Sequence, residues 1–179
     1  MGRKIRLIKA ISFIVKKESI SFSAFRSHYE TTHAPLAQEL LSPPFYERNY
    51  VYETINGNSD IGSISIFKYP DIQALTTVNS ILESSGAIAL KEDELKFMQP
   101  EKNYFYLVDE KILKSSKNNE RAFIVCSNNI DLSNLEGCML SKNYFDESVI
   151  LECIRSDAVK EIAETEGLEV YLTSTNPDN

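Results

Sequence analysis

The only two histidines of this chain, His28 and His33, lie in one short segment that leads directly into Pro35. Histidine is the side chain whose ordinary pKa lets it accept and donate protons near neutral pH. Acid–base chemistry by an imidazole is therefore expected in this segment. As a general base, His33 could remove a proton from a phenol or an activated methylene group, an effect worth about 10²–10⁴-fold in rate. The alternative is structural: His33 hydrogen-bonds backbone groups that Pro35 leaves without partners and fixes a kink.

The histidine segment is predicted to be helical. Ser21 is a good N-cap, and the apolar residues that follow have the three-and-four spacing of a helix face. Pro35 predicts a kink or a restart near residues 33–35. Five residues turn an ideal helix by about 140°. We therefore expect His28 to leave the face of His33, unless the kink rotates the two rings together, and to be a surface or interface residue. The same spacing argues against a two-histidine metal site, which needs three or four residues.

The elements around this helix follow a recognisable order. Strands are predicted at residues 5–15, 46–55, 62–69 and 104–108 from their β-branched and aromatic content. A second helix is predicted between the N-cap Asp71 and Gly86, with a short segment at 91–97 before the last strand. The resulting β-α-β-β-α-β order is that of a ferredoxin-like unit.

The same order recurs in shortened form after a polar linker at residues 114–120. Strands are predicted at 122–126, 139–145, 148–154 and 168–172, and a helix at 157–166, while 131–135 allows one helical turn at most. Lys142-Asn143-Tyr144 falls where Arg48-Asn49-Tyr50 stands in the first half. We interpret this as an α+β chain of two tandem ferredoxin-like units, residues 1–113 and a degenerate 121–179. An unrelated strand-rich extension is the alternative.

Each unit would cover one face of its sheet with helices and leave the other apolar face open. A free-standing unit of this size buries only about 60% of its unfolded surface and is marginally stable. We therefore expect the two sheets to stack face to face within one chain and to close a barrel-like core, as an internal mimic of a dimer.

Four motifs, in order and at the right spacing, resemble the EthD family of the dimeric α+β barrel proteins. They are Phe25 with His28-Tyr29 and His33-Ala34-Pro35-Leu36-Ala37, then Tyr46-Glu47-Arg48-Asn49, then the strand at 62–67, then Asp93-Glu94-Leu95-Lys96-Phe97. The resemblance spans roughly residues 5–110. It implies a ferredoxin-like unit whose sheet faces another sheet, with a small-molecule pocket between helices and sheet.

The resemblance also implies a type of activity. Members of the family are associated with cofactor-independent cyclisation, dehydration and isomerisation of aromatic, polyketide or lactone-like compounds. One position departs from the pattern: the third strand of the family commonly carries an acidic residue, and Ser65 stands there in this chain. That departure removes a potential orienting partner of the histidine.

The candidate site consists of His33 as the catalytic residue and Tyr29, Tyr46, Asn49 and Tyr52 as substrate-binding residues. Tyrosines with a buried ring and a solvent-exposed hydroxyl group suit aromatic ligands, although core packing explains the presence of these tyrosines equally well. In a regular strand Tyr46 points to one side and Asn49 to the other, where it could instead satisfy backbone groups at the strand end. Asp93 and Glu94 are predicted to cap a short helix.

Composition excludes several other classes of function. A net charge of −7 and a pI of about 5.0 argue against a nucleic-acid surface. We interpret the basic cluster Arg3-Lys4-Ile5-Arg6, together with Lys9, as a solvated tail beside a strand. No run approaches the roughly 18 apolar residues of a membrane span. Cys126, Cys138 and Cys153 lack metal-ligand spacing, which favours packing roles and a cytoplasmic location. The absence of a phosphate-binding glycine loop predicts no cofactor, and no metal is expected.

The sequence leaves three functions open. The first is a cofactor-free enzyme in which His33 moves a proton and Asn49 or a tyrosine holds the oxygen of a small aromatic, polyketide-like or lactone substrate. The second is a non-catalytic barrel that binds a small apolar molecule. The third is an assembly module that pairs with another copy as a homodimer. A partly polar cavity at His33 would favour the first two functions, and a packed interior the third.

Overall fold

The computed structural model describes residues 7–163 and 167–176. Residues 3–6 of the basic cluster lie outside this part of the chain, as do residues 164–166 of the helix predicted at 157–166. The interpretation of Lys9 as part of a solvated tail is wrong, because its side chain is buried and pairs with two glutamates. No helix within the described ranges is long and apolar enough to cross a membrane.

The strands of the described chain form one closed antiparallel barrel in the order β1-β3-β2-β8-β5-β7-β6-β4. Closure of a barrel within a single chain, expected from the sequence, is therefore confirmed. The strands are β1 (Ile8–Val15), β2 (Phe45–Ile55), β3 (Ile61–Tyr69), β4 (Tyr104–Ile112), β5 (Glu120–Ser127), β6 (Met139–Phe145), β7 (Ser148–Ile154) and β8 (Glu169–Ser174).

The two halves of the chain contribute four neighbouring strands each. The first half supplies β4-β1-β3-β2 and the second half β8-β5-β7-β6, so each half has its fourth strand beside its first and its third beside its second. The ring closes where β2 pairs with β8 and β4 pairs with β6. Both closures join the second strand of one half to the fourth strand of the other.

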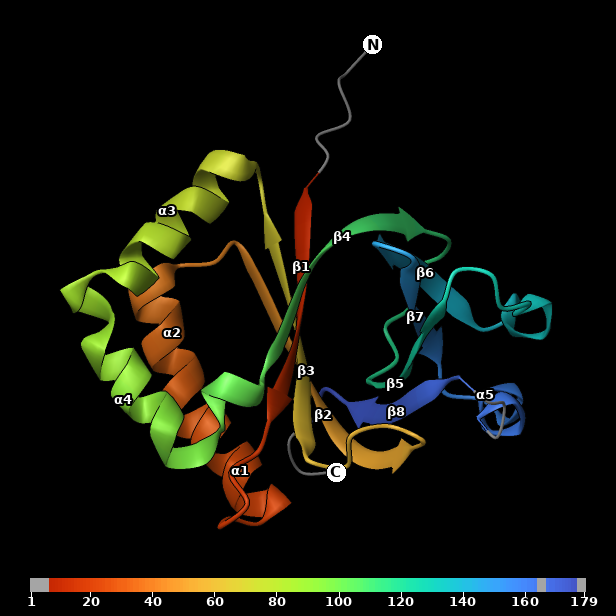
Figure 1. Cartoon of the computed structure of the whole chain (residues 1–179), viewed down its shortest axis with the longest axis horizontal. Helices are drawn as coiled ribbons and strands as arrows, with labels where there is room; N and C mark the ends of the chain where they lie inside the picture. Colours follow the sequence, from red (N-terminus) through yellow and green to blue (C-terminus); the bar gives the residue numbers. More distant parts are fainter. Residues whose placement is uncertain (1–6, 164–166, 177–179) are drawn as a thin grey trace.

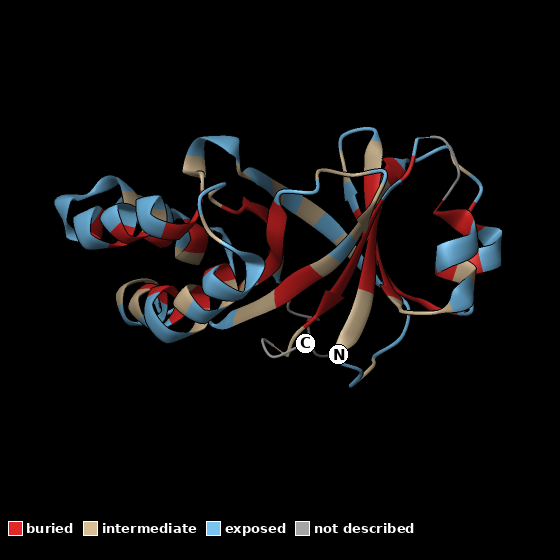
Figure 2. Ribbon diagram, turned by 90° about the horizontal axis from the view of Figure 1, so that it is seen from below, coloured by how far each residue is buried: buried red, intermediate tan, exposed pale blue. Residues whose placement is uncertain are grey.

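Helices cover the outer surface of the barrel unequally (Figure 1). Four α-helices and a π-helical turn lie against the first half: α1 (Phe22–His28), η1 (Tyr29–His33), α2 (Ala34–Leu41), α3 (Ile72–Glu83) and α4 (Ile88–Phe97). On the opposite side, α5 (Asp157–Ile162) and the 3-10 turn η4 (Ser133–Leu135) cover the second half. Figure 2 shows the buried residues on the strands and on the helix faces that turn toward them.

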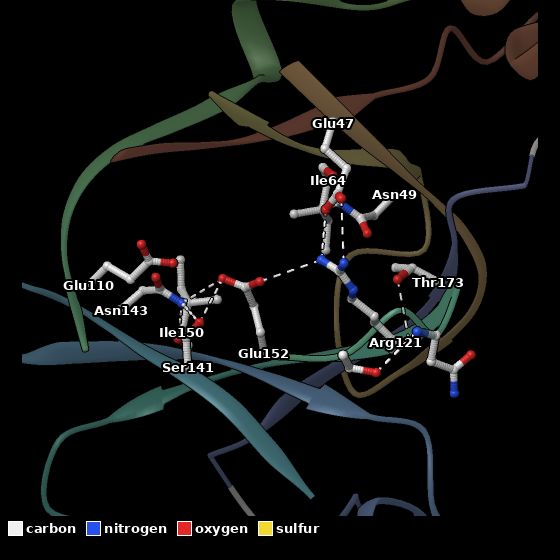
Figure 3. A network of polar contacts seen from close by, with 12 residues as sticks. Glu47, Asn49, Ile64, Glu110, Arg121, Ser141, Asn143, Ile150, Glu152 and Thr173 are labelled. Atoms are coloured by element: carbon white, nitrogen blue, oxygen red, sulfur yellow. Dashed lines mark hydrogen bonds and ion pairs between the residues drawn. The ribbon is translucent and has the colours of Figure 1, made fainter. Parts of the chain in front are cut away.

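The side chains inside the barrel are apolar at its centre and charged at one of its ends. Its centre is apolar and includes Ile11, Ile64, Phe123 and Ile150. The end where β1 and β5 begin holds charged side chains instead (Figure 3). There Lys9, 1% exposed, pairs with Glu152 and Glu110, while Arg121 pairs with Glu47 at 2.7 Å and lies 3.7 Å from Glu152.

Candidate functional site

A cavity of about 190 Å³ lies between the helices α2, α3 and α4 and the outer face of β1, β3 and β4. Three of the residues singled out from the sequence, His33, Tyr29 and Tyr46, line it. Most of the other lining side chains are apolar: Ile14, Ala37, Leu41, Phe67, Leu75, Val78, Leu82, Leu90, Met98 and Phe105. The cavity is therefore a mainly apolar chamber whose wall also contains one imidazole, a few hydroxyl groups, the carboxyl group of Glu94 and the amides of Asn79 and Asn103.

The helix that carries the imidazole contains a π-helical turn. The N–H of Ala34 donates to the carbonyl of Tyr29, a five-residue spacing, and Pro35 lies in the first turn of α2, which begins at Ala34. Proline has no N–H to donate to the preceding turn, so it is tolerated only where a new helix starts. The interruption predicted near Pro35 is present, and it begins earlier than expected.

The π-turn changes the relation between the two histidines. Because residues five apart lie one above the other in such a turn, His28 and His33 come to the same side of the helix instead of diverging. Both rings pack on Phe97, with centroids 4.8 and 4.9 Å away. The expectation that the two rings diverge holds only for an uninterrupted α-helix and is wrong here, since the interruption brings them together, the exception that the sequence left open. The side chain of His28 is nevertheless partly exposed.

Asp93, on α4, bridges the two histidines. Its Oδ2 lies 3.1 Å from Nδ1 of His33 and its Oδ1 lies 2.9 Å from Nε2 of His28. The carboxyl group is 2% exposed, whereas the side chain of His28 is 27% exposed. The capping role predicted for Asp93 is wrong, because α4 begins at Ile88 and Asp93 lies inside the helix, beyond its first turn. Its carboxyl group contacts both imidazoles instead.

This contact determines which nitrogen of His33 is available for chemistry. A carboxylate at Nδ1 favours the tautomer that carries its proton there, which leaves Nε2 with a lone pair. Among the described residues Nε2 has no hydrogen-bond partner, and the ring lines the cavity. Burial lowers the pKa of His33, and the Asp93 carboxylate only partly offsets this effect. The imidazole is therefore neutral at neutral pH and able to accept a proton.

Besides the His33–Asp93 pair, a chain of hydrogen-bonded hydroxyl groups, called here the hydroxyl strip, lies at the wall of the cavity. The Tyr46 hydroxyl donates to that of Tyr29 at 2.8 Å, and the Tyr29 oxygen lies 3.0 Å from Oγ of Ser65. Burial raises the pKa of both tyrosines, and hydrogen bonding between them raises that of Tyr46 further. The strip therefore stays protonated and can act only as a hydrogen-bonding surface near neutral pH.

Two of the predicted substrate-binding residues lie elsewhere. Asn49 is fully buried on the opposite face of β2, where its amide donates to the carbonyl of Ile64 at 3.1 Å. The Tyr52 ring packs against the core of the second half, with the Arg155 guanidinium 5.5 Å from its centroid. Neither residue lines the cavity.

Comparison with known proteins agrees with this geometry. The EthD domain model matches residues 17–101, which contain both histidines, Asp93 and the tyrosines of the cavity. This segment is an EthD domain. No curated protein matches the sequence.

Three solved structures resemble the chain. An EthD family protein from Bacillus halodurans C-125 is 20% identical and covers 59% of this chain and 100% of its own, with a TM-score of 0.45. A proposed chlorite dismutase is 9% identical, covers 93% of this chain and 94% of its own, and has a TM-score of 0.55. An anthrone oxidase-like protein is 5% identical, covers 95% and 92%, and has a TM-score of 0.50. The last two share the fold over the whole chain, including the half beyond the EthD domain.

Sequence reasoning missed one further residue of the EthD domain cavity. Glu94 lines it beside Met98, and burial raises the pKa of its carboxyl group. The signal for both Asp93 and Glu94 was present, since the Asp-Glu-x-x-Phe motif is one of the four that carry the family resemblance. Nothing in the local sequence indicates that this motif packs against a helix about 60 residues earlier.

Proposed function

We propose that the EthD domain is a cofactor-independent enzyme that removes a proton from a small aromatic, polyketide-like or lactone compound. The observation that carries the proposal is the buried Asp93–His33 pair: Asp93 holds Nδ1 of the imidazole, and the residue lines a mainly apolar cavity. An engineered cavity of about 150 Å³ in another protein holds benzene, so a chamber of about 190 Å³ suits one ring or two fused rings.

The groups around the cavity have separate roles in this proposal. His33 accepts the substrate proton at Nε2, and the Asp93 carboxylate stabilises the imidazolium that forms, as in other acid–base pairs of this kind. The Tyr29 hydroxyl accepts from Tyr46 and can also accept from Ser65, which leaves its own proton free to be donated to the substrate oxygen on which negative charge develops. The same imidazolium can return its proton to another atom, which gives isomerisation, cyclisation or loss of water according to the substrate.

We also infer that the barrel consists of two unequal ferredoxin-like units, residues 1–113 and 121–179. Equivalent asparagines support this division. Asn49 on β2 stands opposite Ile64 on β3 and donates to its carbonyl; Asn143 on β6 stands opposite Ile150 on β7 and donates to it at 2.9 Å. The helices of the second unit are reduced to α5 and η4, so we assign the His33 chemistry to the first unit alone.

The experiment follows proton removal directly, without knowledge of the natural substrate. The probe is 2-tetralone, a two-ring ketone with an activated methylene group, whose exchange with D₂O is followed by NMR. We expect the protein to accelerate exchange above the buffer rate, and His33→Asn to lower that acceleration about 10²-fold or more. Tyr46→Phe should reduce it less, and Tyr52→Phe, a matched tyrosine outside the cavity, should leave it unchanged.

Two outcomes would contradict the enzymatic proposal. If the folded native protein does not accelerate exchange, or if His33→Asn retains the full effect, His33 is not the base. Saturable binding of 2-tetralone without exchange would assign the cavity to ligand binding, the alternative that its mainly apolar lining favours.

A further inference from the structure

A second pocket lies at the end of the barrel opposite the charged network. Its volume is about 300 Å³, larger than the His33 cavity, and it is lined by Phe13, Tyr104, Tyr106, Tyr171, Asn58 and Glu169. The two spaces lie on opposite faces of the same strands. Ser12 and Ile14 of β1 line the His33 cavity, whereas Phe13 between them lines the barrel pocket. In Figure 1 the helices of the EthD domain and the barrel accordingly lie on opposite sides of β1.

Aromatic rings form the wall of this barrel pocket. Phe13, 2% exposed, lies at its centre, with the rings of Tyr171, Tyr106 and Tyr104 at 5.6, 6.2 and 6.5 Å in edge-to-face arrangements. Tyr104 is 44% exposed, so the group opens to solvent on one side. Barrel mouths are a common place for small-molecule sites.

Tyr171 is held firmly in this wall. Its hydroxyl accepts from the N–H of Asn58 at 3.1 Å and donates to Glu169 at 2.7 Å. The β2–β3 turn also closes over the ring: a Cβ at Gly57 would lie 2.7 Å from the ring of Tyr171, which only glycine avoids. The wall is therefore preorganised and needs little reordering when a ligand binds.

The strand registers explain how one carboxylate comes to stand among the rings. In the first half, Phe13 faces Tyr104 and Ile11 faces Tyr106 across β1 and β4. In the second half, Val125 faces Glu169 and Phe123 faces Tyr171 across β5 and β8. Glu169 therefore occupies the place in the second half that corresponds to Tyr104 in the first. Its carboxyl group is the acidic group in an otherwise mainly aromatic wall of the barrel pocket.

The charged side chains that act on the tyrosines of the barrel pocket, Glu169 and Asp146, are both acidic. Burial, Glu169 and Asp146 all raise the pKa of Tyr106, and burial and Glu169 likewise raise that of Tyr171. No lysine or arginine is among the residues that line the pocket. Aromatic faces with a nearby carboxylate attract cations, above all weakly hydrated alkylammonium ions, and they offer nothing to an anion.

We propose that the barrel pocket binds a small organic cation with an alkylated ammonium group, which packs on the tyrosine rings and pairs with Glu169. This site is separate from the proposed His33 chemistry and does not depend on it.

Choline and its uncharged isostere, 3,3-dimethylbutan-1-ol, test the proposal by isothermal titration calorimetry on the full chain. We expect choline to bind at a 1:1 ratio and the alcohol to bind at least about tenfold more weakly, because only the charge differs. Glu169→Gln keeps an acceptor for Tyr171 and should weaken choline binding about fivefold or more, as should Tyr104→Leu. Glu83→Gln, which removes an exposed carboxylate on α3, should have no effect, and neither should His33→Asn.

Three results would overturn the proposal. They are the absence of saturable choline binding to the native protein, equal affinity for choline and the alcohol, and choline binding that survives both Glu169→Gln and Tyr104→Leu. Thermal unfolding of each variant confirms that the fold is retained. Because Glu169 and Tyr104 are both exposed, at least one variant is expected to fold normally.

Discussion

The imidazole of His33 is subject to two opposing influences. Its burial disfavours the charged form, and the Asp93 carboxylate favours it; burial is the larger effect, so the pKa lies below the usual value of 6.5. A base with this environment is unprotonated at neutral pH, yet it has a partner ready for the cation that forms once it takes a proton. The contribution of Asp93 is therefore greatest in the state that follows proton transfer.

This balance predicts the titration of His33. With only two histidines in the chain, their Cε1–H signals can be followed by proton NMR and assigned with a His28→Gln variant. We expect His33 to titrate below pH 6.5, and Asp93→Asn to move its titration to still lower pH, because the charge that raises the pKa is gone. In Asp93→Asn, the pH at which the rate of 2-tetralone exchange falls on acidification should likewise move to a lower value. A titration of His33 above pH 6.5 in the native protein would contradict this account.

At the level of the elements, local patterns predicted the strands well and the site poorly. The strands predicted at 139–145 and 148–154 coincide with β6 and β7, and Asp71 caps α3 as expected. Alternation and capping are encoded within a few residues, so they can be recognised without a structure. The π-turn and the Asp93 contact depend on how α1, η1 and α4 pack together, which no local pattern contains. For Asn49, the strand face and the alternative of a backbone partner were both available from the sequence, but not that this partner is the carbonyl of Ile64 on β3.

The packing of α1 on β3 provides a test at this level. Phe25, fully buried in α1, lies over Gly62, and a Cβ at that glycine would lie 2.6 Å from the phenylalanine ring. We expect Gly62→Ala to lower the free energy of unfolding by about 1–3 kcal/mol through overpacking, as measured by urea denaturation. Gly137→Ala is the control: beyond its chain neighbours, no atom lies within 4 Å of the position that the added methyl group would take, and a change within about 0.5 kcal/mol is expected. Adding Phe25→Leu to Gly62→Ala should recover part of the loss if the clash is the cause.

At the scale of the whole molecule, the barrel has two unlike ends. One end holds Lys9, Arg121 and their carboxylate partners in the interior, and the other holds the aromatic pocket. Both follow from alternation along β1 and β5, where every second residue faces inward. The sequence places Lys9 in a predicted strand and Arg121 just before one, but the burial of both becomes apparent only when closure of the barrel is known. The charged end leaves two acceptors, Oδ1 of Asn49 and Oδ1 of Asn143, without partners among the described residues.

The charged end predicts a strong and pH-dependent role for Lys9. Burial acts to raise the pKa of Glu152, but Lys9, Ser141 and Asn143 outweigh it and hold the pKa below the ordinary value of 4.5. Glu152 thus stabilises the native protein above pH 4.5, and this stabilisation is lost as the pH falls through its lowered pKa. We expect Lys9→Met to lower the free energy of unfolding at pH 7 by about 3–5 kcal/mol, because it leaves the buried Glu152 carboxylate without its nearest cation and with only Arg121 at 3.7 Å.

The loss caused by Lys9→Met should shrink as the pH falls toward 4.5, because Glu152 without Lys9 takes up a proton more readily and the buried charge disappears. Urea denaturation at several pH values measures both effects. Lys102→Met is the matched control: Lys102 lies 3.4 Å from Glu18 in an exposed ion pair, whose loss should cost less than about 1 kcal/mol and change little with pH. An equally small loss of free energy of unfolding in Lys9→Met and Lys102→Met would contradict this account. Water would then have to screen Glu152 at the charged end of the barrel, and the buried ion pairs would contribute little to its stability.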